Sequence, residues 1–149
     1  MSQYIDVVEQ FLQQEEWKYD RPEASLILTG VKGENGSIHI FFTGMEGQSV
    51  FSLLLKPDFT IPEGKRSEIA EFITRANYGL LVGGFAMDFS DGDLRYAAAI
   101  DMADGELTPS MIRSMLGRCV GTLDRYVPGI MQVLYANIPP KDAIHTIEG

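Results

Sequence analysis

Three aspartates lie close together in the segment MDFSDGDLRY. Asp88, Asp91 and Asp93 stand beside a glycine and a serine, a composition typical of calcium-binding loops. An EF-hand loop needs oxygen ligands at its first, third and fifth positions, a glycine at the sixth and a glutamate at the twelfth. Counted from Asp88, the fifth position is Gly92 and the twelfth is Ala99, so the calcium template fails.

The same segment fits the tip of a β-hairpin. Asp91-Gly92 favours a two-residue turn, because both central residues of such a turn need positive φ. This turn places Asp88 opposite Arg95 as a cross-strand ion pair worth about 0.2–1 kcal/mol. We therefore predict structural roles for these acids, and we expect neither a metal site nor a cofactor.

The other residues that commonly take part in catalysis are few and scattered. His39 falls within a predicted strand and His145 falls near the end of the chain, a spacing that predicts no metal site or catalytic triad. Cys119 is the single cysteine and occupies a core position of the last predicted helix, where a small buried hydrophobe is expected. Neither a G-x-S-x-G motif nor a phosphate-binding loop occurs, so we predict that the protein is not an enzyme.

Composition narrows the choice of partners. The 149 residues fit one domain, and the formal net charge is -9. Nucleic acids and anionic membranes need clustered lysines and arginines, so neither is an expected partner. The N-terminus has no signal-peptide pattern, and no stretch approaches the ~18 apolar residues of a membrane span. We expect a cytoplasmic protein.

Periodicity and turn signals predict the elements that carry these residues. Helices are expected at residues 3–17, with Ser2 as N-cap, at residues 63–77, ending at Asn77, and from the N-cap Thr108 to the Pro139-Pro140 break. Hairpin turns are expected at residues 35–36, 46–47 and 91–92. The order α-β-β-β-α-β-β-α predicts an α+β fold with a single antiparallel sheet of five strands. The domain is expected to span residues 1–140, followed by a flexible tail at residues 141–149.

The predicted sheet has two apolar faces. One face is assigned to the core: Ile27, Val31, Ile38, Ile40, Phe42, Phe51, Leu53 and Leu55. The opposite face is too apolar to be fully solvated, and it continues onto a flat platform of small residues. Its candidate partner-binding residues are Leu26, Leu28, Phe41, Val50, Leu54, Gly84, Ala86, Ala97 and Ala99. The first helix, another subunit or a client chain is expected to cover this face.

The chain resembles the YbjN family. The resemblance lies in IPEGKRSEIAEFITRANY, in GGFAMDFSDGDLRYAAAI, in the helix LTPSMIRSMLGRCVGTLDRYVPGIMQV and in WKY at residues 17–19. It covers most of residues 3–136, and its motifs are diffuse rather than catalytic. The positions that align with the recurring polar residues of the family are Arg66, Asn77, Asp88 and Arg95.

Members of this family are described as bacterial sensory transduction regulators. Their fold is similar to that of type III secretion chaperones, with one antiparallel sheet packed with helices, and they are often dimeric. The resemblance therefore implies a non-enzymatic module, chaperone-like or regulatory, that binds a protein partner or client polypeptide and forms a homodimer.

An alternative hypothesis is that the protein is a small-ligand sensor. A small-ligand sensor would have a pocket between the last helix and the sheet, near Trp17, Tyr78 and Met115. Aromatic residues at the ends of elements and methionines on a helix are also common in ordinary cores, so these residues do not decide between the two readings.

Overall fold

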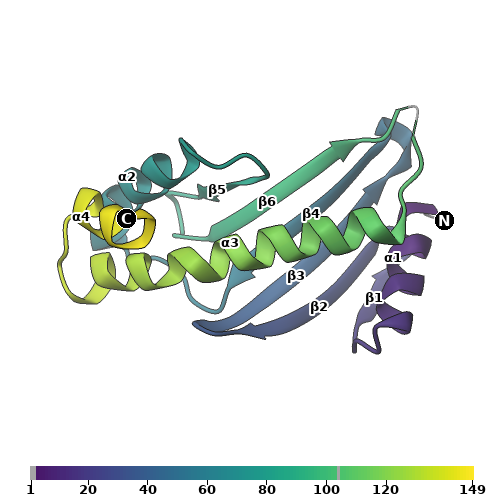
Figure 1. Ribbon diagram of the computed structural model, residues 1–149, viewed down its shortest axis with the longest axis horizontal. Helices are drawn as coiled ribbons and strands as arrows, with labels where there is room; N and C mark the ends of the chain where they lie inside the picture. Colours follow the sequence, from purple (N-terminus) through teal and green to yellow (C-terminus); the bar gives the residue numbers. More distant parts are fainter. Residues whose placement is uncertain (1–2, 104) are drawn as a thin grey trace.

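The computed structural model describes residues 3–103 and 105–149 (Figure 1). Within these residues the chain forms four α-helices, six strands and two short 3-10 helices. The helices are α1 (Gln3–Gln14), α2 (Arg66–Asn77), α3 (Pro109–Tyr135) and α4 (Pro140–Glu148). The strands are β1 (Asp20–Glu23), β2 (Leu26–Gly33), β3 (Gly36–Met45), β4 (Val50–Pro57), β5 (Gly84–Met87) and β6 (Leu94–Asp101).

The strands form one antiparallel sheet in the order β1-β2-β3-β4-β6-β5. Helices α1 and α3 pack on one face of this sheet, which we call the inner face, while α2 and α4 lie together beyond β5 at the far end of α3 (Figure 1). The residues assigned to the core from the sequence lie on the inner face, and all are buried except the half-buried Val31. The α+β class is confirmed.

The predicted number of five strands was wrong, because β1 was missed. This strand contains Pro22 and is largely exposed, so it has neither the β-branched composition nor the apolar alternation by which a strand is recognised. Tertiary ion pairs hold it instead: the guanidinium of Arg21 lies 2.9 Å from Asp6 and 2.9 Å from Glu9 of α1. Helix α1 ends at Gln14, three residues before the predicted end, and the predicted cap Ser2 lies outside the described residues.

All three predicted hairpin registers are displaced by two residues. The predicted turn at residues 35–36 would place Thr29 opposite Phe42, but Thr29 pairs with Ile40. The predicted turn at residues 91–92 would place Phe85 opposite Ala98, but Phe85 pairs with Tyr96. The face of each residue was nevertheless correct, because side chains alternate with a period of two and a shift of two preserves that alternation.

The first displacement has a visible cause in α3. The carboxylate of Asp124 accepts hydrogen bonds from the backbone N–H groups of Glu34 and Asn35, at 3.1 and 2.9 Å. The turn therefore consists of these two residues, with Gly33 paired to Gly36, rather than of the Asn-Gly pair that the local sequence favours. The contact with Asp124, about ninety positions away in the sequence, therefore determines the position of the turn against the local preference for Asn-Gly.

Helix α3 is the main support of the inner face. It begins as predicted, with the Thr108 hydroxyl accepting from the Met111 N–H at 3.2 Å and a proline at the first helical position. It continues without a break through Pro128. Its apolar stripe, which includes the fully buried Cys119 and Leu123, packs onto β4 and β6.

The segment from Lys141 onward is not a loose tail. It forms most of α4, in which Ala143 and Ile144 are buried against α2 and α3. The Tyr126 hydroxyl of α3 donates to the Glu148 carboxylate at 2.7 Å and holds the end of α4. The isoleucines of this short segment were visible in the sequence, but the surface that buries them exists only after α2 and α3 have packed.

Candidate binding surfaces

The predicted partner-binding residues share the face of the sheet opposite to α1 and α3, which we call the outer face. The observed register aligns Leu28 with Phe41, Phe41 with Leu54, and Leu54 with Ala97. These pairs make an apolar row across β2, β3, β4 and β6. The sequence therefore placed these side chains on one surface correctly, even though it gave the wrong partners within each hairpin.

The outer face is open within residues 3–103 and 105–149. Of the three covers expected from the sequence, the first helix is excluded, because α1 packs on the inner face with α3 (Figure 1). A hollow of about 360 Å³ lies on the outer face between β4 and β6 and is lined by Leu54, Ala97 and Ala99. At Gly84 the outer face is not open, because a Cβ there would lie only 3.3 Å from the side-chain oxygen of Asn77.

Charges at the edge of this face differ from those predicted. Arg95 does not pair with Asp88 but lies 3.4 Å from Asp93, which also lies 3.2 Å from the ammonium group of Lys56. Lys56 in turn stands 5.7 Å from the centre of the Phe41 ring. The cations are thus held beside the apolar row by Asp93 and by an aromatic ring.

The cluster of aspartates builds its own loop. The Asp88 carboxylate accepts from the Ser90 N–H at 2.8 Å, and Asp91 accepts from the Asp93 N–H at 2.9 Å. The hydrogen bond from Ser90 is the main cause that lowers the pKa of Asp88, and the Arg95 charge adds to it. These are turn-forming contacts, and the described residues contain no group of three or more His, Cys, Asp or Glu side chains arranged to hold a metal ion.

Arg66 fastens this loop to the start of α2. Its guanidinium donates to the carbonyls of Ile61 at 3.0 Å and Phe89 at 3.1 Å. Gly92 is buried at φ 76°, where a Cβ would collide with the Ile61 carbonyl. The Asp91-Gly92 pair is therefore needed for the fold of the loop, which runs over residues 88–93 and is longer than the predicted two-residue turn.

The two histidines and the cysteine do not come together. His39 lies 3.2 Å from Asp58 on the sheet, whereas His145 is exposed on α4. Burial raises the pKa of the Cys119 thiol to about 11, so the thiol is protonated at neutral pH and is a poor nucleophile. Asn77 has a structural role beyond ending α2, because its side chain exchanges two hydrogen bonds with the Phe85 backbone at 2.9 and 2.7 Å.

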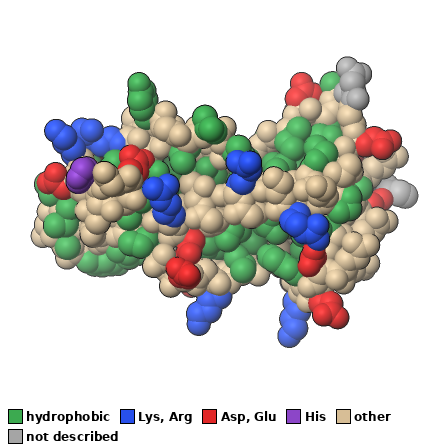
Figure 2. Space-filling model, in the orientation of Figure 1, with side chains coloured by type: hydrophobic (Ala, Val, Ile, Leu, Met, Phe, Trp, Pro, Cys, Tyr) green, Lys and Arg blue, Asp and Glu red, His purple; other side chains and the backbone are tan. Residues whose placement is uncertain are grey.

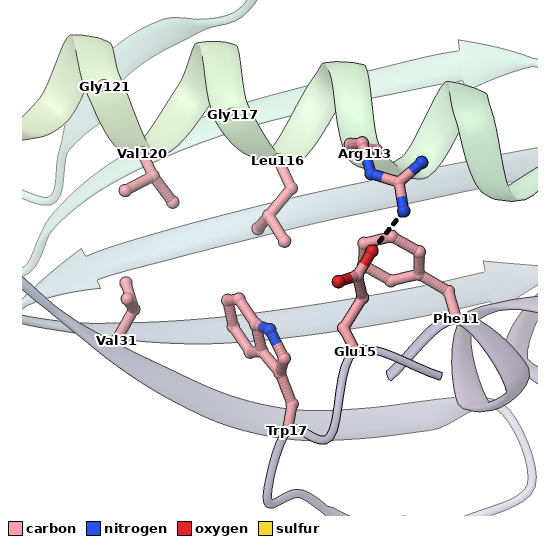
Figure 3. Close-up of a pocket in the computed structure, with 9 residues that line it drawn as sticks. All are labelled: Phe11, Glu15, Trp17, Val31, Arg113, Leu116, Gly117, Val120 and Gly121. Carbon is pink, nitrogen blue, oxygen red and sulfur yellow. Dashed lines mark hydrogen bonds and ion pairs between the residues drawn. The ribbon is translucent and has the colours of Figure 1, made fainter. Parts of the chain in front are cut away.

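The structure has a second surface, a groove that the sequence revealed only in part (Figure 3). It has a volume of about 430 Å³ and lies between α3, the end of α1 and strand β2. The side chains of Leu116 and Val120 project from α3 toward the Trp17 side of the groove (Figure 3). The lining residues are Phe11, Glu15, Trp17, Val31, Arg113, Leu116, Gly117, Val120 and Gly121.

The predicted pocket matched this groove in one residue of three. Trp17 lines it, but Met115 is buried and not part of the lining, and Tyr78 is 97% exposed elsewhere. The signal that could have located the groove is the pair Gly117 and Gly121, spaced by four on an otherwise strongly helical segment. Two glycines on one face of a helix leave a hollow beside it.

The comparisons with known proteins agree with this architecture. Residues 4–131 match the YbjN family model, described as "Putative bacterial sensory transduction regulator". The chain belongs to the YbjN family. The crystal structure of "YbjN, a putative transcription regulator from E. coli" has a TM-score of 0.62 to this chain, with 12% sequence identity over 89% of this chain and 90% of that one.

A second solved structure shares the fold. A chain in the crystal structure of the ExsC–ExsE complex has a TM-score of 0.51 and 16% sequence identity, over 81% of this chain and 90% of that one. At these identities the likeness concerns the fold alone. The search of curated proteins found no match to this chain. Across the described residues, no helix combines the length and the apolar character needed to cross a membrane.

Proposed function

We propose that this YbjN-family protein is a non-enzymatic regulator of bacterial cells, chaperone-like in fold, that acts in the cytoplasm by binding polypeptides. The observation that carries this proposal is the open outer face, where Leu28, Phe41 and Leu54 form an apolar row that the described helices leave uncovered. Contiguous apolar surface of this kind marks a protein contact in soluble proteins. A fold neighbour solved as a complex of two proteins supports the same reading.

The occupant that we assign to the outer face is a second copy of the chain. The strands of this row, β2, β3, β4 and β6, contain only four formally charged residues, Lys32, Lys56, Arg95 and Asp101, and carry a net charge of +2 within a chain of net charge -9. Two copies of this acidic chain repel one another over most of their surfaces, but the strands of the outer face do not share the net negative charge. A two-fold contact must be self-complementary, and both signs of charge stand beside the apolar row.

Sedimentation velocity tests this assignment. Wild-type protein should sediment as a dimer at micromolar concentration, and Leu54→Asp should shift it to a monomer with unchanged far-UV circular dichroism, because an unpaired carboxylate in a buried contact is costly. The matched control is Leu81→Asp, since Leu81 is 96% exposed and lies outside the outer face. A monomeric wild type, or a Leu54→Asp variant that remains dimeric, contradicts the assignment.

The wider polypeptide-binding role has its own test. Selection from a displayed random-peptide library against the wild-type protein should enrich related sequences, and synthetic versions of them should bind with micromolar dissociation constants or better. A library that yields no binding sequence after repeated rounds, or sequences that bind a heat-denatured sample equally well, contradicts the role.

A small apolar ligand is a second candidate, favoured by the groove beside α3. Its volume of about 430 Å³ falls within the range of about 300–1,000 Å³ that is common for small-molecule sites. Trp17 is the only tryptophan and lines this groove, so its emission reports occupancy. A metabolite that raises the melting temperature and shifts this emission supports the ligand, while a flat response across a broad library counts against it.

A further inference from the structure

The exposed side of α3 is basic although the protein is acidic. The helix contains Arg113, Arg118 and Arg125 and a single acidic residue, Asp124, which gives it a net charge of +2 against -9 for the whole chain. Asp124 is occupied by the turn between β2 and β3. All three arginines are exposed, and Figure 2 shows Lys and Arg side chains gathered along the course of α3.

The three arginines differ in the number of ion pairs and hydrogen bonds that their guanidinium groups make within the protein. Arg113 pairs with Glu15 at the rim of the groove, yet its side chain remains 63% exposed. Arg125 donates one hydrogen bond to the Ile147 carbonyl at 3.2 Å. The guanidinium of Arg118 has no hydrogen bond or ion pair among residues 3–103 and 105–149. These groups retain donors for an external carboxylate.

Between the arginines, α3 presents a low surface next to the groove. Its exposed positions there are Ser114, Gly117 and Gly121. A Cβ added at either glycine would meet nothing within 4 Å. A second helix can therefore lie close to α3 at this place, with side chains from successive turns directed toward Trp17 and Leu116.

We propose that the groove and the adjoining basic side of α3 bind an acidic amphipathic helix of a partner protein. The apolar side of that helix fills the groove, and its carboxylates face Arg118 and Arg125. The opposite rim, at the end of α1, carries Glu15 and Glu16, so the acidic side of the partner is turned toward α3. This inference rests on the proposed polypeptide-binding role but uses a different surface from the outer face.

A pair of designed peptides tests the proposal. The probe has about 18 residues, with leucines at i, i+3, i+4 and i+7 and glutamates at most other positions. Its counterpart has lysines in place of the glutamates. At about 0.1 M salt, where charges beyond about 10 Å are screened, the acidic peptide should bind at least about tenfold more tightly, as read from Trp17 emission and calorimetry. Its affinity should fall as salt rises, because local attraction outweighs repulsion by the distant acids.

Two variants locate the site. Arg118→Glu should weaken the acidic peptide by about threefold to tenfold and strengthen the basic one. Gly121→Leu should fill the groove and weaken binding by more than about tenfold without loss of stability, since leucine favours a helix more than glycine does. Ser110→Leu, at an exposed α3 position outside the groove lining, is the control and should bind as the wild type does.

The outcomes separate this inference from the wider proposal. Equal affinity for the two peptides, no binding of either, or unchanged binding by Gly121→Leu overturns the acidic-helix site. If the displayed library still yields binding sequences in that case, the polypeptide-binding role survives and only its location and partner chemistry fall. Leu54→Asp should leave the affinity for the acidic peptide unchanged, because Leu54 lies on the outer face.

Discussion

Two glycines of α3 should respond to alanine in opposite directions. Gly121 faces solvent, and a Cβ there meets nothing within 4 Å, whereas Gly129 is buried beside α2 and α4. A Cβ at Gly129 would lie 2.8 Å from two atoms of the Phe72 ring and 2.9 Å from a side-chain carbon of Ile147. Phe72 is fully buried and packs edge-on against Tyr126, so its ring has little room to move.

The expected magnitudes follow from these contacts. Alanine inside a helix is more favourable than glycine by about 0.8–1 kcal/mol, so Gly121→Ala should raise the free energy of unfolding by that amount. Gly129→Ala gains the same term but adds a methyl group to a filled core, which costs about 1–3 kcal/mol. Because the ring cannot withdraw, we expect the upper part of that range and a net loss of about 1–2 kcal/mol.

Urea unfolding followed by circular dichroism measures both changes. The two variants should differ in unfolding free energy by about 2–3 kcal/mol, with unchanged dependence on urea concentration. A Gly129→Ala variant as stable as Gly121→Ala would refute the packing of α4 and α2 against α3. A destabilised Gly121→Ala would refute the open groove beside that helix.

Three further perturbations test the contacts that hold the surfaces in place. Arg21→Met should lower the unfolding free energy by about 1–3 kcal/mol, because it leaves two carboxylates of α1 without their cation. The control Arg75→Met removes an exposed ion pair and should cost under about 0.5 kcal/mol in the same urea titration. Asn77→Ala should cost about 1–3 kcal/mol and speed amide exchange at Phe85, whose backbone loses both side-chain partners; unchanged exchange would contradict this. Burial raises the pKa of the Cys119 thiol to about 11 from an ordinary value of 9.0, so the protonated thiol contributes fully to stability below pH 9 and this contribution is lost as the pH rises toward 11. Over this pH range the free energy of unfolding should fall by about 1–2 kcal/mol more in wild type than in Cys119→Ala. Equal losses in the two proteins would contradict the burial of the thiol.

Side-chain alternation made the sheet predictable from the sequence. The apolar residues of β2, β3 and β4 repeat with a period of two, so Leu28, Phe41 and Leu54 fell on one face even though each register was off by two. The caps of α3 were equally readable, because Thr108 and Pro109 act through contacts within a single turn. Local chemistry decides both features.

The missed features depend on contacts between distant segments. Strand β1 exists because Arg21 reaches α1, and α4 forms on a surface that α2 and α3 build together. The Asp88–Arg95 pair failed because the register is displaced by two residues: Ala86 lies opposite Arg95, and Arg95 lies beside Asp93 instead. The groove needs Trp17, β2 and α3 at once, so the glycine pair of α3 could indicate only one of its walls.

Labelling the outer face with an environment-sensitive dye tests the central claim most directly. Ala99 is exposed on this face, and native Cys119 is fully buried with a raised thiol pKa, so a dye attached at Ala99→Cys labels one site. If the outer face pairs with a second copy, emission from this site should shift to shorter wavelength as protein concentration rises through the dimer midpoint, while the same dye at Leu81→Cys stays unchanged. Emission at position 99 that does not depend on concentration, in a sample whose mass shows a dimer, would contradict the claim that the outer face pairs with a second copy.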